Sequence, residues 1–282
     1  MDSQCLQCHM GRALDTARSL GTEEQATVFA RELMQLYLSA PGVSSPNFGP
    51  GVAALLEKHY GLDKDRYREE KRFSNAFVME RLDTIERQVG STEDPVLAAL
   101  KFAIMGNYLD FSALQGKVSF EALDNMLAQA LDMKLDMVCY RSLCADLEKG
   151  RRLLYLTDNA GEIVFDRVLA QQLQKRYPHL QILFCVRGGP VSNDATRTDA
   201  AEIGLPFPVI DNGNTVGGTE LSLLSEEARQ ALENADVVIA KGMGNTETLY
   251  GCPYNVYYAF LVKCPRFQRK FGKPLFTPML VK

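Results

Sequence analysis

The chain has 282 residues, of which 46% are hydrophobic and 23% are charged, as is typical of a soluble globular protein. Its formal net charge of −4 provides no long-range attraction for nucleic acid, and no stretch is apolar and long enough to span a bilayer. We therefore expect no nucleic-acid partner and no membrane partner. The first residues lack the basic start and apolar run of a secretory signal, so we expect a cytoplasmic protein with reduced cysteines.

The first half of the chain, residues 1–149, has the apolar spacing of helices. Thr22 and Gln25 fit a capping box, in which each side chain satisfies the backbone amide of the other. Proline at position 95 suits the first turn of another helix, because its missing amide would be unpaired there anyway. We expect these helices to pack as a bundle. The apolar faces of two of these helices are formed by Phe29, Leu33, Leu36 and Tyr37 and by Val78, Leu82, Ile85 and Val89. A loop is expected over 41–51, and helix-like sequence continues over 119–148.

The second half, residues 150–282, has short apolar runs separated by helix-like segments. This pattern is typical of a parallel sheet that helices cover on both faces. We therefore predict an α/β fold with a helical N-terminal region and an α/β/α core. The predicted strands lie at 153–156, 182–186, 207–210 and 237–240, and the run 256–262 fits either a fifth strand or a helix.

Polar and glycine-rich residues follow the apolar runs directly, at 157–162, 187–190, 211–213 and 241–245. Because the carboxyl ends of parallel strands lie along one edge of a sheet, these loops should converge there. Asp158, Asn159 and Asp194 would supply hard oxygen ligands, which suit Mg²⁺ or Mn²⁺. Lys241 adds a positive charge, and its flanking glycines allow backbone amides to approach an anion. Each loop alone is equally typical of a turn or helix cap, so only their coincidence favours a phosphate site.

The cysteines offer a second candidate site. Cys5 and Cys8 have the spacing of two ligands of a tetrahedral metal ion, with His9 beside them. No second ligand pair follows nearby, so reduced structural or redox-active thiols are the alternative. The other cysteines and histidines form no pattern typical of a Cys-His or Ser-His-Asp catalytic set.

Several segments resemble, in order and spacing, the motifs of the damage-control phosphatase family, formerly called domain of unknown function 89. They are residues 158–162, 187–196 and 241–247, together with 106–110, which resembles the Gly-Asn-x-x-Asp element of the family. The pair Cys5-x-x-Cys8 is similar to that of the microbial subgroup. The resemblance spans nearly the whole chain. It implies a helical region on a Rossmann-like core and metal-dependent hydrolysis of small phosphorylated metabolites.

The resemblance also implies roles for individual residues. Asp158, Asn159 and Asp194 would bind Mg²⁺ or Mn²⁺, with Co²⁺ or Ni²⁺ as alternatives. The implied phosphate-binding residues are Asn107, Arg187, Lys241 and Asn245. The implied catalytic residues are Asp158, Glu162 and Asp110, and Cys5 and Cys8 form the candidate second metal site. Either water or Asp158 would attack the phosphorus.

Two other functions stay open on the sequence. The first is an S-adenosylmethionine-dependent carboxyl methyltransferase, an activity that has been proposed for relatives of this family. Against it, Gly242-x-Gly244 lacks the third glycine of the dinucleotide fingerprint and follows a late strand. The second is a non-catalytic sensor of a phosphometabolite or metal. The sequence specifies neither the substrate, nor the preferred metal, nor the oligomeric state.

Overall fold

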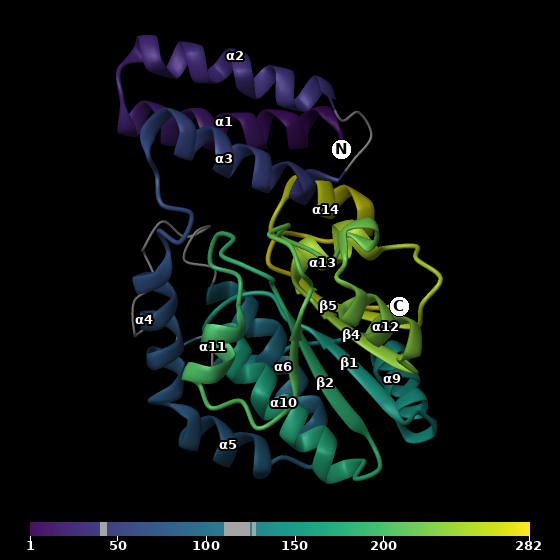
Figure 1. Ribbon diagram of the computed structural model, residues 1–282. Helices are drawn as coiled ribbons and strands as arrows, with labels where there is room; N and C mark the ends of the chain where they lie inside the picture. The colour runs from purple at the N-terminus through teal and green to yellow at the C-terminus, as the bar shows by residue number, and fades with distance from the viewer. Residues whose placement is uncertain (40–43, 110–124, 126–127) are drawn as a thin grey trace.

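The computed structural model describes residues 1–39, 44–109, 125 and 128–282, with a helical first half followed by alternating strands and helices (Figure 1). The first half contains α1 (Ser3–Leu20), α2 (Glu23–Ser39), η1 (Ser45–Phe48), α3 (Gly49–Tyr60), α4 (Arg68–Met79), α5 (Leu82–Gly90), α6 (Pro95–Gly106), η2 (Asn107–Leu109) and α9 (Met137–Lys149). The strands are β1 (Arg152–Leu156), β2 (Gln181–Val186), β3 (Val209–Asp211), β4 (Val237–Lys241), β5 (Val256–Leu261) and β6 (Pro278–Val281). The helices among them are α10 (Glu162–Arg176), α11 (Arg197–Glu202), η3 (Leu221–Leu223), α12 (Glu226–Asn234), α13 (Gly242–Leu249) and α14 (Pro265–Phe271).

A six-stranded sheet in the order β3-β2-β1-β4-β5-β6 forms the centre of the molecule. Strands β1 to β5 run parallel, and β6 runs antiparallel to β5. Alternate residues of β1 enter different cores: Leu153 and Tyr155 pack with α6 and α10, whereas Leu154 and Leu156 pack with α12. Burial on both faces explains why the strands are nearly continuous apolar runs. The predicted α/β class and mainly parallel sheet are confirmed.

The predicted helix starts are also confirmed. The Thr22 amide donates to Gln25 Oε1 at 2.9 Å, and the Gln25 amide donates to Thr22 Oγ1 at 3.3 Å. Asp94 precedes α6, where its Oδ1 accepts from the Leu97 amide at 3.1 Å. Both caps satisfy backbone donors that have no partner within the helix.

Three boundaries differ from the predictions. The apolar stripe from Val78 to Val89 is divided between α4 and α5, because the chain turns at Glu80 and Arg81. Helix α3 begins inside the expected loop 41–51, with a proline in its first turn. Strand β6 has no predicted counterpart, and it begins with proline, as an edge strand can. The prediction over 119–148 is confirmed at residues 125 and 128–130 and from 137 onward, whereas residues 131–136 are not helical. Residues 119–124, 126 and 127 lie outside the described residues.

Packing divides the helical region into two parts. Helices α1 to α3 form a core of their own around Phe29, Leu33 and Leu56. Helices α4 to α6 and α9 instead share the larger core with one face of the sheet. In Figure 1 the α1–α3 group lies at one end of the molecule, beyond α13 and α14. The change near residue 150 is therefore a change of secondary structure, whereas the packing changes near residues 61–67.

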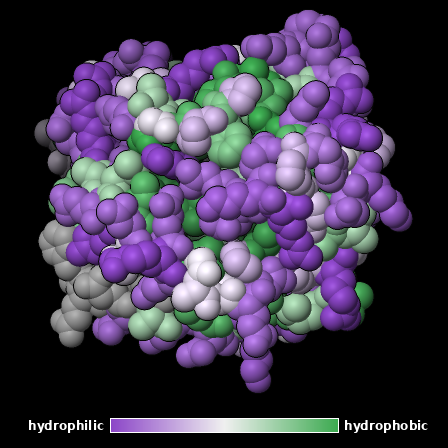
Figure 2. Space-filling model, turned by 90° about the horizontal axis from the view of Figure 1, so that it is seen from below, coloured by the Kyte–Doolittle hydropathy of each residue, from purple (hydrophilic) through white to green (hydrophobic). Residues whose placement is uncertain are grey.

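Hydrophobic side chains are dispersed on the surface at the end of the molecule opposite to the α1–α3 group. The face that includes α5, at the bottom of Figure 1, is mostly hydrophilic with small separate hydrophobic patches (Figure 2). None of the described helices combines the length and apolar character that crossing a membrane requires.

The contacts of Asp94 generate a stability prediction. Its second oxygen accepts from the Tyr140 hydroxyl at 2.7 Å, and Arg176 lies 3.2 Å from the first, so Asp94→Ala removes a helix cap, a partly buried hydrogen bond and an exposed ion pair together. We expect the free energy of unfolding to fall by about 1–2 kcal/mol, measured by urea denaturation. Asp132→Ala is the control, because this exposed side chain makes no hydrogen bond with the described residues. Equal effects of the two substitutions would contradict the role given to Asp94.

Candidate functional site

Backbone hydrogen bonds join the loops that follow β1 and β2. The Ala195 amide donates to the Asp158 carbonyl at 2.7 Å, and the Ala160 amide donates to the Asn193 carbonyl at 2.8 Å. As a result Asn159 and Asp194 pair as an isolated antiparallel bridge. The structure thus brings together the three residues predicted as metal ligands, and it does so through the main chain.

The Asp158 carboxylate is held by amides on one oxygen. Its Oδ2 accepts from Asn107 Nδ2 and from Asn159 Nδ2, both at 2.9 Å. Burial and the negative charges of Asp194 and Glu162 raise the pKa of Asp158 well above its usual value. A carboxylate whose pKa is raised by burial and by neighbouring negative charges is stabilised in its ionised form when a cation binds beside it.

The donor set fits a hard divalent cation. Asp158 and Asp194 contribute carboxylates, and the amide nitrogen of Asn159 donates to Asp158 Oδ2 and, at 2.8 Å, to Glu162 Oε2. In this orientation the amide nitrogen faces the carboxylates, so the Asn159 oxygen would bind the same cation only after the amide group turns over. Carboxylate and carbonyl oxygens are the ligands that Mg²⁺ and Mn²⁺ prefer.

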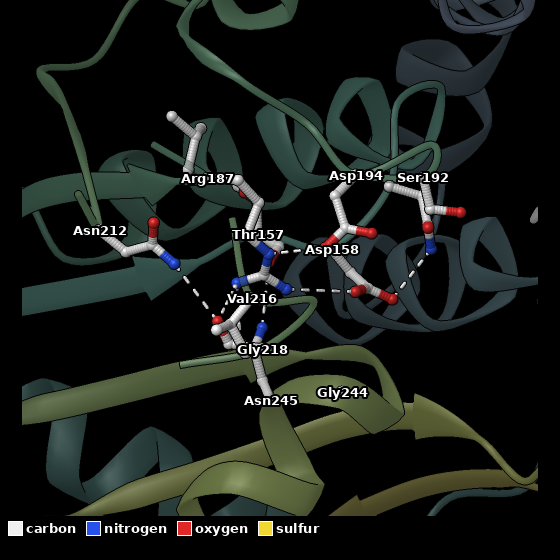
Figure 3. A network of polar contacts seen from close by, with 12 residues as sticks. Thr157, Asp158, Arg187, Ser192, Asp194, Asn212, Val216, Gly218, Gly244 and Asn245 are labelled. Atoms are coloured by element: carbon white, nitrogen blue, oxygen red, sulfur yellow. Dashed lines mark hydrogen bonds and ion pairs between the residues drawn. The ribbon is translucent and has the colours of Figure 1, made fainter. Parts of the chain in front are cut away.

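Arg187 lies between the two carboxylates and is only 2% exposed. Its Nε donates to Asp194 Oδ2 at 2.6 Å, and its Nη2 lies 3.5 Å from Asp158 Oδ1. Its Nη1 donates to the Gly218 carbonyl and to Asn245 Oδ1, both at 3.1 Å (Figure 3). The guanidinium is therefore fixed by protein groups and balances the carboxylates, which differs from the direct phosphate contact expected from the sequence.

The Lys241 side chain is fully buried, in a position that differs from the phosphate contact expected of it. Its Nζ donates to the Ala103 carbonyl at 2.8 Å and to Glu162 Oε1 and Asp166 Oδ1, both at 2.7 Å. Burial lowers the pKa of Lys241, but the charges of Asp166 and Glu162 outweigh it and raise the pKa to about 12. An ammonium has three hydrogens, so none is left in this arrangement for a phosphate.

The other predicted polar residues also face inward. Asn107 Nδ2 donates to Glu162 Oε2 at 2.9 Å as well as to Asp158, and Asn107 is fully buried. Asn245 Nδ2 donates to the carbonyls of Thr157 and Lys241 at 3.0 and 2.7 Å. These two asparagines and Glu162 support the site from behind, whereas direct contact with phosphate or catalysis was expected of them. The predicted catalytic Asp110 lies outside the described residues.

A glycine permits the close approach of α13 to Asp158. Gly242 has φ +76°, and a Cβ added there would lie 1.9 Å from Asp158 Oδ2. Any other residue would displace the carboxylate or the helix. The N-terminus of α13, which carries partial positive charge, is thereby placed beside Asp158.

Two relevant residues were missed by the sequence analysis. Lys263 follows β5, and its charge acts to lower the pKa of Asp158. The sequence does contain a signal for Lys263, because the apolar run 256–262 directly precedes it and ends at the same edge of the sheet. The sequence analysis left open whether this run is a strand or a helix. Asp166 was missed as well, although it lies one helical turn after Glu162 and therefore shares its side of α10.

The cysteine pair does not gain further ligands. Cys5 and Cys8 both lie in α1, and all seven cysteines are free. Among the residues that the structure describes, no three His, Cys, Asp or Glu side chains are grouped so as to hold a metal ion. That finding leaves Cys5 and Cys8 without a third such ligand. The proposed ligands at Asp158 differ in kind, because they are two carboxylates and one amide, that of Asn159.

Comparisons with known proteins place these features in a family. Residues 1–276 match the family model described as the damage-control phosphatase ARMT1-like domain. An uncharacterized protein of Methanocaldococcus jannaschii is 30% identical over 99% of this chain and 94% of its own. Proteins described as damage-control phosphatases are 32% identical in Pyrococcus horikoshii, over 78% of this chain and 75% of the relative, and 29% identical in Archaeoglobus fulgidus, over 95% and 94%. The crystal structure of a DUF89 family protein from P. horikoshii has a TM-score of 0.86 at 26% identity, covering 100% of this chain and 98% of that one.

The position of Gly242 generates a prediction with an internal control. Gly242→Ala and Gly251→Ala both place alanine at positive φ, but nothing lies within 4 Å of the Cβ added at Gly251. We expect Gly251→Ala to cost about 1–2 kcal/mol of stability and Gly242→Ala to cost more, because the clash with Asp158 adds to the same backbone strain. Only Gly242→Ala should displace the Asp158 carboxylate in a crystal structure and weaken Mn²⁺ binding in calorimetry. An unmoved Asp158 in that variant would show that the close approach is not needed.

Proposed function

Because the chain belongs to the damage-control phosphatase ARMT1-like family, we propose that it is a divalent-metal-dependent phosphatase of small phosphorylated metabolites. The names of its P. horikoshii and A. fulgidus relatives support the phosphatase class. The observation that carries the proposal is the convergence of Asp158, Asn159 and Asp194 at the carboxyl edge of the sheet. These residues would hold Mg²⁺ or Mn²⁺, with Co²⁺ or Ni²⁺ as alternatives. The bound cation would withdraw negative charge from the phosphoryl oxygens.

The phosphate would bind between the N-terminus of α13 and Lys263. Helix N-termini favour anions, because their first amides have no partner within the helix. Lys263 supplies a positive charge at the end of β5 and close enough to act on Asp158. This placement gives Lys263 the role that the sequence had assigned to Lys241. Such groups stabilise the charge that develops on the transferring phosphoryl group.

The inner residues would keep the reacting groups in position. Lys241 fixes Glu162, and Glu162 fixes the amides of Asn107 and Asn159, which in turn hold Asp158 Oδ2. Asp158 Oδ1, which lies 3.5 Å from Arg187 Nη2, would then be the oxygen available to a cation or to phosphorus. In the overall reaction water supplies the new P–O bond, the bond to the leaving group breaks, and the alcohol takes up a proton.

The methyltransferase alternative has less support, because the glycines of its suggested nucleotide loop serve chain packing. A Cβ added at Gly244 would lie 2.0 Å from the Gly217 carbonyl oxygen. Glycine is therefore required there by the contact between two chain segments. The free cysteines agree with the cytoplasmic location that we propose.

Asp158→Asn tests the function directly. We expect metal-dependent phosphate release to be lost, because asparagine keeps the size of the side chain but removes the charge that balances a cation. The fold should persist, because burial already opposes the charged form of Asp158. The measurement is phosphate release from a panel of phosphometabolites with Mg²⁺, Mn²⁺, Co²⁺, Ni²⁺ or a chelator. Asp83→Asn, in the distant helix α5, is the control, and wild-type rates in Asp158→Asn would refute the proposal.

The two lysines should differ in the kind of defect that their loss causes. Lys241→Ala leaves Glu162 and Asp166 buried without their cation, so we expect the free energy of unfolding to fall by about 3–5 kcal/mol. Lys263→Ala should leave stability within about 1 kcal/mol of wild type, because the side chain is partly exposed. It should lower kcat/KM by at least about tenfold, and Lys263→Arg should restore part of it. Urea denaturation and steady-state kinetics provide the comparison; a stable, low-activity Lys241→Ala would reverse the assignment.

A further inference from the structure

A cleft of 760 Å³ separates the α1–α3 group from the loop that carries Asp194. Helices α1 and α3 form one wall, residues 190–192 contribute to the other, and Lys64, Arg66 and Tyr67 line the cleft as well. Small apolar side chains such as Ala13, Ala53 and Ala54 leave room between the walls. Ser192 lines the cleft and lies beside Asp194 (Figure 3). One wall of the cleft therefore lies two residues along the chain from Asp194, although Asp158, Asn159 and Asp194 do not themselves line it.

The same loop carries an unsatisfied donor. Asn193 is 6% exposed, and its Nδ2 is buried with no hydrogen-bond partner among the described residues. A buried amide donor without an acceptor costs about 1–3 kcal/mol. Asn193 does not itself line the cleft, so the loop bears this cost whether or not the cleft is occupied.

Two of the cations that line the cleft lack ionic partners, whereas Lys64 pairs with Glu57 at 2.7 Å. Arg12 and Arg66 form no ion pair with any carboxylate in the described ranges, and Arg66 instead lies over the ring of Tyr67 at 4.8 Å. A second cleft, of 420 Å³ and lined by α4 and α11, differs in this respect. Its cations are neutralised by neighbours, as in the pairs Lys71–Asp199 at 2.6 Å and Arg197–Asp211 at 2.5 Å. Of the two clefts, the larger one therefore offers two guanidinium groups without an ion pair, together with one carboxylate, that of Asp15.

We infer, on the basis of the proposed phosphatase function, that the larger cleft binds the leaving group of the substrate. The preferred esters would carry a second anionic group, a carboxylate or a second phosphate, on a scaffold with an apolar part. The apolar part would lie along α1 and α3, and Arg12 and Arg66 would bind the second anion through charge-assisted hydrogen bonds. Phosphate esters without that anion would be poorer substrates.

Three esters of one chain length provide the test: hexyl phosphate, 6-(phosphonooxy)hexanoate and 1,6-hexanediol bisphosphate. We expect the wild-type protein to favour the two with a terminal anion by about tenfold in kcat/KM. The double variant Arg12→Gln/Arg66→Gln should lose this preference and keep its rate on hexyl phosphate. Arg31→Gln is the matched control, since Arg31 in α2 is exposed, has no ion pair with the described residues and does not line the cleft. Preference for one anionic ester over the other would identify the second anion.

Calorimetry with hexylphosphonate and 6-phosphonohexanoate separates the two levels of the inference. If no ester is hydrolysed with any metal, the phosphatase proposal fails, while tighter binding of 6-phosphonohexanoate that the double variant abolishes would still support the cleft. If hydrolysis occurs without preference for a terminal anion, or if the preference survives in the double variant, the inference about the cleft is overturned and the phosphatase proposal stands.

Discussion

Lys241 carries its positive charge into the interior of the protein, where Glu162, Asp166 and the Ala103 carbonyl use its three hydrogens. These contacts join β4, α10 and α6, so the end of the sheet and two helices have one relative position. Tyr155 adds a fourth element, because its hydroxyl donates to Asp166 at 2.7 Å from β1. A buried ion pair gains little overall stability, but breaking it is costly, and this makes it suited to fixing geometry. The positions of Asp158 and Asn159 at the reaction site depend on this fixed interior.

The charge balance of the buried groups explains why the edge of the sheet suits a divalent cation. If all are ionised, the carboxylates exceed the cations by two negative charges. The groups concerned are Asp158, Glu162, Asp166 and Asp194 against Arg187 and Lys241. Without added positive charge, burial and mutual repulsion oppose ionisation of Asp158, as the direction of its pKa shift indicates. A divalent cation would remove this conflict, and Lys263 at the rim would then face the phosphate.

The sequence predicted the positions of the loops better than the directions of the side chains. Strand spacing and the polar residues after each strand were sufficient to place Asp158 near Asp194, because parallel strands end at one edge. The inward turn of Lys241 and Asn245 could not be read from spacing, because it depends on acceptors from Ala103 and Thr157, which are distant in sequence. Short edge strands such as β6 give little periodic signal. The cleft beside α1 could not be predicted from the sequence either, since it arises from the packing of segments that are distant in the chain.

Anomalous diffraction from crystals soaked with Mn²⁺ and orthophosphate tests the central claim most directly. We expect one manganese peak within about 2.0–2.6 Å of oxygens from Asp158, Asn159 and Asp194. Phosphate should lie between the N-terminus of α13 and Lys263, with Lys241 still bound to Glu162 and Asp166. Manganese at another group of residues, or phosphate in direct contact with Lys241, would contradict the division between an inner ion network and an outer reaction site.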